Sequence, residues 1–282
     1  MSKPVAARLE PGSFQAVSIL LITACLFSSA PALADAVTVR YKEGLIHGFL
    51  SVSTQDGDPI GTGDLTQVAH GDRVTNHLDL RLKDGSRQEE TTVFSQRGAF
   101  RLISYHLTQQ GPAFKTPTDV SITASTGQVT VQYTDDGGKG KTVREHLKLP
   151  PDLANGLVPT LLKNLRPDAP QLEVSMVVAT PKPRLVKLSI STHGNDRFSV
   201  IGWGREAIDY TVKVDLGGIV GVVAPMIGKQ PPDTHIWILG GDAPAFIKSE
   251  VLAFAGGPIW RIELAVPTWS KTAQPDEKAM KQ

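Results

Sequence analysis

Seven histidines and a few acidic residues are the side chains of this chain best suited to bind a metal or move a proton. No two histidines have the i, i+4 spacing of a helical zinc pair, and no H-E-x-x-H motif occurs. His77 and Asp79 stand two residues apart in an alternating segment, which places both on one face of a strand. With a third ligand from a neighbouring strand they would bind a metal, but such pairs more often belong to a solvated polar face. We therefore predict no metal site.

The other catalytic patterns are incomplete. Gly138–Thr142 ends like a phosphate-binding loop, but that motif needs a glycine at position 135, where Asp135 stands, and its context is strand, turn, strand. No G-x-S-x-G nucleophile motif occurs. Glu89 and Glu90 are neighbours on an expected strand, so they point to opposite faces and cannot act together on one bond. The sequence thus predicts no catalytic residue and no cofactor.

Apolar residues in unusual places favour a ligand-binding cavity instead. The expected strand 99–109 is apolar on both faces, with Phe100 and Leu102 on one of them, although core packing is the commoner cause of such a strand. In the loop 111–117, Phe114 lies between two prolines that stiffen the chain. This arrangement favours a ring presented as a lid, or alternatively a ring tucked under the edge of the sheet.

The segment 217–228 is apolar throughout but has only about half the length needed to span a bilayer. It would line or gate a pocket, touch a membrane surface, or plug the open end of the sheet as a buried loop or short helix. The predicted ligand-binding residues are Phe100, Leu102, Phe114, Val220, Val222 and Val223.

The elements that must position these residues are mostly strands. Apolar and polar residues alternate in segment 74–82, as in a half-buried strand, and Asp84-Gly85 follows as a tight hairpin turn. Strands joined by such short turns are antiparallel. Further strands are expected at 89–96, 99–109, 120–122, 129–133, around Val143, and at 172–179, 184–190, 208–214, 234–239 and 259–266.

One segment has helical periodicity. Leucines recur every four residues at Leu153, Leu157, Leu161 and Leu165. Asp152 is expected to cap this helix, Pro159 to kink it and Pro167 to end it. The fold class predicted is mainly β: a curved antiparallel sheet or half-barrel with one amphipathic helix packed on it and a short apolar helix or loop.

Composition excludes several function classes. The 282 residues include 29 Lys and Arg against 28 Asp and Glu, a formal net charge of +1. Nucleic-acid binders carry a basic excess, which is absent here, and a binder of anionic membranes is disfavoured for the same reason. With 40% hydrophobic residues the chain has enough apolar surface to fold.

The N-terminus has the pattern of a secretory signal peptide. Lys3 and Arg8 precede an apolar run, 16–27, and Ala32-Leu-Ala34 follows as a cleavage site. We expect a signal peptide at 1–34, a single antiparallel β-rich domain at 35–270 and a flexible tail at 271–282. The mature protein would be periplasmic or secreted, without a transmembrane span and, since Cys25 is the only cysteine, without a disulfide. Lipidation at Cys25 is the alternative.

Three segments carry a resemblance to known proteins: Thr134–Lys139, Leu149–Pro159 and Pro231–His235. With them the chain resembles an uncharacterised family of secreted bacterial proteins, a domain of unknown function. In architecture it looks like the lipoprotein-carrier half-barrels of the Gram-negative periplasm, whose curved sheet wraps a hydrophobic cavity closed by helices. The resemblance implies a cavity for a lipid or another hydrophobic ligand and assigns no binding residue.

The function expected is that of an exported, non-enzymatic protein that holds a hydrophobic ligand or a protein segment in an apolar cavity. Such a cavity needs few polar groups and no catalytic motif. One alternative is an envelope interaction or assembly protein that pairs with an envelope protein through exposed sheet edges. The other is a hydrolase or isomerase with an unrecognised polar site around His77 and Asp79.

The cleavage site gives a direct prediction. N-terminal sequencing of the exported chain should begin at Asp35, because the small residues Ala32 and Ala34 suit the signal peptidase. A chain that instead begins at a lipid-modified Cys25 would contradict the expected cleavage.

Overall fold

The computed structural model describes residues 36–135, 137–166, 169, 171–179, 182–200, 202–215 and 231–267. The predicted signal peptide, 1–34, and the predicted tail, 271–282, lie outside these residues. So does the apolar segment 217–228, with Val220, Val222 and Val223.

The described residues form fourteen strands and one short helix, and all the strands belong to a single antiparallel sheet. This confirms the predicted fold class of a curved antiparallel sheet with one packed helix. The elements are β1 (Ile46–Thr54), β2 (Pro59–His70), β3 (Arg73–Leu82), β4 (Arg87–Ser95), β5 (Arg101–Gln110), β6 (Thr118–Thr123), β7 (Gln128–Thr134), β8 (Gly140–His146), α1 (Val158–Asn164), β9 (Leu172–Val178), β10 (Arg184–Val200), β11 (Trp203–Asp215), β12 (Thr234–Leu239), β13 (Ala245–Leu252) and β14 (Ile259–Leu264).

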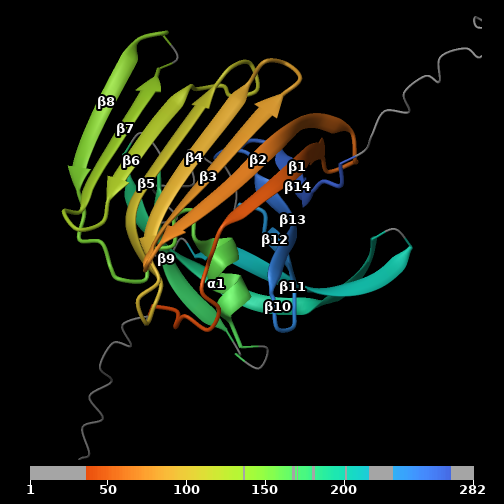
Figure 1. Ribbon diagram of the computed structural model, residues 1–282. Helices are drawn as coiled ribbons and strands as arrows, with labels where there is room; N and C mark the ends of the chain where they lie inside the picture. The colour runs from red at the N-terminus through yellow and green to blue at the C-terminus, as the bar shows by residue number, and fades with distance from the viewer. Residues whose placement is uncertain are drawn as a thin grey trace, which may run out of the picture. The chain divides into compact units, whose positions relative to one another are not determined.

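The sheet consists of two meanders joined by one strand pair. Each strand from β1 to β8 pairs with the next along the chain, and so does each from β9 to β14. The pair β1–β14 connects the two halves, with Leu50 opposite Leu264 and Thr54 opposite Trp260. Figure 1 shows the sheet curving so that β9, β10 and β11 lie across from β4, β5 and β6, with α1 between them. The concave face of the sheet therefore encloses the helix.

Two predicted strands are longer than the sequence pattern indicated. β10 and β11 continue beyond the expected 184–190 and 208–214 and pair as far as Val200 opposite Trp203. Most of the added part is exposed on both faces, with Ala207 the buried exception, so it lacks the alternation that burial of one face imposes. Figure 1 shows this end of the β10–β11 hairpin projecting from the sheet.

The helix begins later than predicted. Its first residue is Val158, its N-cap is Leu157, and no side chain caps it. Pro159 stands in the first turn, where a missing N–H costs no helical hydrogen bond, so it does not kink a longer helix. α1 ends at Asn164, before position 167, which lies outside the described residues. In the part of the chain described, no helix is long and apolar enough to cross a bilayer.

The segment before the helix covers the free edge of β9, and this is why the helix does not start at Asp152. The Ala154 N–H donates to the Ser175 carbonyl at 2.8 Å, and the Ser175 N–H donates to the Asp152 carbonyl at 3.2 Å. The Asn155 amide bonds both backbone groups of Val177, each at 2.9 Å. The Asp152 carboxylate accepts from Ser175 and Lys187 and not from the helix, so its predicted capping role is wrong. Tertiary pairing with an exposed strand edge has replaced the first helical turns.

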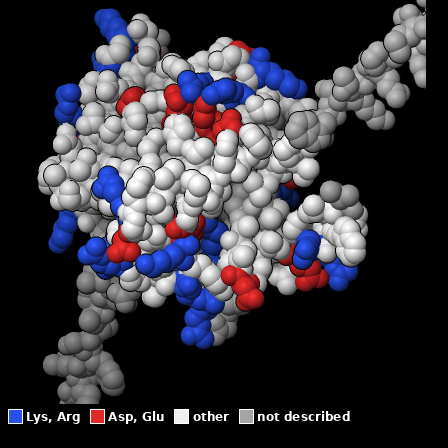
Figure 2. Space-filling model, in the orientation of Figure 1, with Lys and Arg blue, Asp and Glu red and all other residues white. Residues whose placement is uncertain are grey.

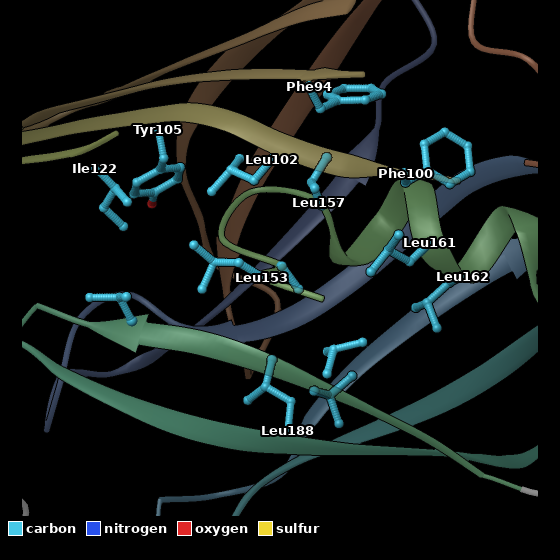
Figure 3. Packing of buried hydrophobic residues seen from close by; sticks show 14 of the residues in the cluster. Phe94, Phe100, Leu102, Tyr105, Ile122, Leu153, Leu157, Leu161, Leu162 and Leu188 are labelled. Atoms are coloured by element: carbon cyan, nitrogen blue, oxygen red, sulfur yellow. The ribbon is translucent and has the colours of Figure 1, made fainter. Parts of the chain in front are cut away.

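Three of the four leucines in the predicted stripe lie in the centre of the core, whereas Leu165, the C-cap of α1, is half-buried. We call four buried leucines the leucine plug: Leu153, Leu157, Leu161 and Leu162. In Figure 3 the plug lies between two sets of strand residues, with Phe94, Phe100, Leu102 and Tyr105 on one side and Leu188 on the other. The plug thus joins the two halves of the sheet through one apolar cluster.

Replacing Leu157 or Leu161 with Ala should lower the free energy of unfolding by about 2–5 kcal/mol, because each truncation leaves a cavity in the centre of the core. Chemical denaturation measures this. The matched control is Leu45→Ala, since Leu45 is 82% exposed; its effect should stay within about 0.5 kcal/mol. Equal, small effects at all three positions would show that the plug does not hold the sheet together.

Candidate functional site: a cavity beside the leucine plug

A cavity of about 480 Å³ lies between the α1 segment and the concave face of the sheet. Its volume is within the range of small-molecule sites in proteins, and most of its lining is apolar. Residues 154–160 and Lys163 form one wall, and strands from both halves of the sheet form the others. Its apolar lining includes Leu50, Leu65, Leu78, Leu188, Val212, Ile236, Phe246, Val251 and Ile262.

A second cavity, of about 590 Å³, adjoins the first. It extends toward β6, β7 and the segment after β13, and includes Val120, Val131 and Phe254 in its lining. The side chains that line both cavities are Tyr105, Asn155, Met176, Val214, Thr234 and Val251. These shared residues make the two cavities neighbouring chambers of one hollow inside the curved sheet.

Polar side chains form a row across one wall of the first chamber. Strand register places Gln67 opposite Asn76, Asn76 opposite Thr92, and Thr92 opposite Tyr105. We call these four residues the polar row; all four line the chamber. The Asn76 Oδ1 atom is buried and has no hydrogen-bond partner among the described residues. An unpaired buried acceptor costs free energy, so this atom suits a donor group of a ligand or a water molecule.

Glu90 lies beside the polar row and presents its carboxyl group to the same chamber. The Tyr105 hydroxyl donates to Glu90 Oε2 at 3.1 Å. Burial raises the pKa of the Glu90 carboxyl, while hydrogen bonds from Tyr105 and Thr92 oppose part of that rise. Burial and the neighbouring Glu90 also raise the pKa of the Tyr105 hydroxyl well above its usual value. Burial thus shifts this carboxyl group toward its neutral, proton-donating form.

Gly156 brings the backbone of the α1 segment against these polar groups. Its φ of +67° is a left-handed conformation that favours glycine. A Cβ at this position would lie 1.9 Å from Thr92 Oγ1 and 2.9 Å from Glu90 Oε1. The sequence thus needs glycine here, because any side chain would push the segment away from the polar row.

A buried ion pair closes one side of the first chamber. Lys163 Nζ lies 2.6 Å from Glu43 Oε1, and both side chains are largely buried. The Gln67 amide donates to the same carboxylate at 2.8 Å, and the Glu43 N–H donates to Gln96 Oε1 at 2.7 Å. The pair is therefore fully hydrogen-bonded, as a buried charge requires, and it fixes α1 to β2 and to the chain before β1.

The mouth of the first chamber is apolar. Ile46 and Leu264 line it and are also exposed to solvent, and the exposed Leu45 precedes Ile46 in the chain. Charged side chains of both signs lie interspersed over the face of the molecule shown in Figure 2, with wide uncharged areas between them. The outer surface in this view thus has no single-sign patch that would select a strongly charged partner.

The three predicted ligand-binding residues that the structure describes do not line either chamber. Phe100 and Leu102 are buried in the cluster of the leucine plug, and neither lines a chamber. Phe114 is buried against Phe254 and Trp260, with ring centroids 5.9 and 5.7 Å apart, so it is tucked under the sheet and is not a lid. Val220, Val222 and Val223 lie outside the described residues. A ligand-binding role for these six residues stays a prediction.

The structure does not bring His77 and Asp79 together as a site. His77 Nδ1 lies 3.0 Å from Thr91 Oγ1. Asp79 is held by Arg81, at 2.6 Å, and by Arg87, at 2.8 Å. Hydrogen bonds from Arg87, and then from Arg81, lower the pKa of the Asp79 carboxyl. Both side chains are thus engaged by neighbours on their own face of the sheet.

Sequence reasoning missed the polar row, although one signal for it was present. In segment 74–82 the alternation that points Leu78 and Leu80 inward also points Asn76 inward. Glu90 and Thr92 likewise share the inward face of β4 with Phe94. Polar residues at positions that the alternation assigns to the core are therefore the sequence signal for a polar wall inside the sheet.

Comparisons with known proteins include a weak similarity to a solved structure. No protein-family model matches the chain, and no curated protein matches it. Among solved structures, it is similar to a beta-barrel-like protein of the domain of unknown function DUF1849 from Brucella abortus. The identity is 10% and the TM-score 0.46, over 82% of this chain and 98% of the other. A similarity this low carries no information about function, so the site rests on the residues described above.

The raised pKa of Glu90 predicts that replacing this residue with Gln increases the free energy of unfolding in a pH-dependent way. The protonated carboxyl stabilises the fold fully below the pKa of the unfolded chain, and this contribution is lost as pH rises through the higher folded-state pKa. Glutamine stays neutral, so the stability of Glu90→Gln relative to the wild type should rise between about pH 4 and pH 7.

Denaturant titrations at several pH values measure this difference. Glu89→Gln is the matched control, since Glu89 is the next residue of β4 and pairs with Arg87. We expect no such gain for it. A Glu90→Gln variant that becomes relatively less stable as pH rises would contradict the burial of this carboxyl.

Proposed function

We propose that the protein is an exported, non-enzymatic carrier that holds a hydrophobic ligand with an acyl chain in the hollow beside the leucine plug. The observation that carries this proposal is the pair of adjoining chambers, about 480 and 590 Å³, with mainly apolar linings and, in the first, a row of polar side chains. That combination is typical of small-molecule binding sites.

The polar groups suggest how such a ligand lies. An acyl chain would contact the apolar lining, including Leu78, Val212 and Phe246. Its polar head would reach the wall where Asn76 Oδ1 offers an unpaired acceptor and where Glu90 presents a carboxyl group whose pKa is raised by burial. Entry past Ile46 and Leu264 keeps the chain in contact with apolar side chains.

The energetics are sufficient for useful affinity. Burial of each methylene group stabilises the complex by about 0.8 kcal/mol. A micromolar dissociation constant corresponds to about −8.2 kcal/mol, after the entropic costs of association are met. Sixteen methylene groups would supply about 13 kcal/mol on burial, which covers a micromolar affinity and an association cost near the lower end of the range of about 4–15 kcal/mol.

Binding of a dansyl-labelled undecanoic acid, followed by its fluorescence, tests the proposal. Val214→Phe should weaken binding at least fivefold, because Val214 lines both chambers and a larger ring there occupies their shared wall. Lys213→Phe is the matched control: Lys213 precedes Val214 on β11, points to the other face and pairs with Asp233, so binding should be unchanged.

The melting temperature of each variant shows whether it is folded, and Thr234→Phe, at a second shared position, replaces Val214→Phe if that variant does not fold. Native mass spectrometry of the protein purified from the envelope should also show a bound lipid. The carrier proposal fails if the wild type does not bind the probe, or if both cavity variants bind it as the wild type does.

A second candidate function is that of an envelope interaction protein. The observation that favours it is the projecting end of the β10–β11 hairpin, where Trp203 is 76% exposed and Val200 is also exposed. Large exposed aromatic residues are enriched at protein interfaces. Trp203→Ser should then abolish cross-linking to an envelope partner while leaving probe binding intact. The cavity variants should weaken probe binding and leave the cross-linking unchanged.

A further inference from the structure

Three side chains that can bind a metal converge where β10, β11 and β12 lie side by side. They are His193 on β10, Asp209 on β11 and His235 on β12. The sequence separates them by 16 and 26 residues, so no local motif joins them. Their nearest ligand atoms all lie within 4.8 Å of one another.

A β-bulge aims His193 at this point. The register of β10 against β11 shifts between Thr192 and Gly194, so His193 is the additional residue of the bulge. Bulges bend a strand and redirect a side chain, and they are frequent beside functional sites. Asp209 lies opposite Trp237, and His235 is two residues before Trp237 on the same strand, so the three groups share one face of the sheet.

The contacts are short and involve both oxygens of one carboxylate. His193 Nδ1 lies 3.1 Å from Asp209 Oδ2, and His235 Nδ1 lies 3.0 Å from Oδ1 and 3.1 Å from Oδ2. The two imidazole rings are edge to face, with centroids 5.6 Å apart. Behind them the Trp237 ring stacks on His235, and Lys248 Nζ lies over the Trp237 ring, 3.6 Å from its centroid. His235 is thus held rigidly toward Asp209.

The charge balance of Asp209 differs from that of the other buried carboxylate on the sheet. Asp79 is 6% exposed and is neutralised by two arginines. Asp209 is 7% exposed, and within the described ranges its side-chain partners are the two imidazoles, with no Lys or Arg in contact. A buried carboxylate needs a positive charge or hydrogen-bond donors close by. A metal cation coordinated by all three groups would supply that charge.

We propose that His193, Asp209 and His235 bind a divalent transition-metal ion, with Zn²⁺ as the best match. Two imidazoles and one carboxylate are a common zinc ligand set. Zinc–ligand bonds of about 2.0–2.1 Å in tetrahedral geometry place neighbouring ligand atoms about 3.3 Å apart, close to the 3.0–3.1 Å contacts here. His193 is 69% exposed, so water can take the fourth position.

Such an ion would join β10, β11 and β12 at the base of the projecting hairpin. Binding to the folded state alone stabilises it in proportion to the logarithm of the free metal concentration. The site is on the face of β11 opposite to the one that carries Val212 into the cavity, so it acts independently of ligand binding.

Isothermal titration calorimetry of the chelator-treated exported chain with zinc chloride tests this proposal. We expect one ion per chain and a raised melting temperature. His193→Gln should weaken zinc binding at least tenfold. Because the His193 side chain is 69% exposed, this substitution should leave the protein folded. His106→Gln is the matched control, because His106 makes a 3.1 Å contact with Asp119 that has no third ligand, and it should bind zinc as the wild type does.

Cobalt(II) titration gives a second readout, because the intensity of its visible bands reports tetrahedral coordination and should be lost in His193→Gln. The proposal is overturned if the wild type binds no zinc, if His193→Gln binds it as tightly as the wild type, or if His106→Gln removes the binding.

Discussion

The packing of the leucine plug between two halves of one sheet is the interaction on which the rest of this structure depends. Two sheet faces in direct contact lie about 10 Å apart, and a helix with its side chains is itself about 10–12 Å wide. An inserted helix therefore holds the layers further apart than strand side chains can bridge. α1 has seven residues, which span only about 10 Å along its axis. The space beside it stays unfilled, and this is the origin of the two chambers.

The plug keeps its place because polar contacts fix both ends of the segment that carries it. At one end, residues 152–155 occupy the edge of β9 that no other strand covers. At the other, Lys163 pairs with Glu43, and Asn164 Oδ1 accepts from the backbone N–H groups of Arg40 and Tyr41. Each of these groups would be costly to bury unpaired. The same contacts that satisfy the buried polar atoms thus determine where the hollow lies.

The two faces of the sheet have different chemistry. The concave face is mainly apolar, and the polar row and Glu90 are among the polar groups that a ligand bound in the first chamber would meet. On the opposite face, charged groups are mostly neutralised by a neighbour on the next strand, as Asp79 is by Arg87. Asp209 departs from this arrangement, since its described partners are histidines. β11 contributes to both features, with Val212 on the inside and Asp209 on the outside.

The sequence by itself determined the properties that depend on near neighbours. Alternation in 74–82 predicted a half-buried strand, short turns such as Asp84-Gly85 predicted antiparallel pairing, and the leucine repeat identified three of the four leucines of the plug, because strand and helix periods are local. Only the tertiary structure decided which distant groups meet. Residues 152–155 pair with the edge of β9 and do not extend the helix, and Phe114 packs against Trp260. The register of four strands aligns the polar row. His193, Asp209 and His235 converge for the same reason: strand register, and a bulge that shifts it, set contacts that no spacing along the chain encodes.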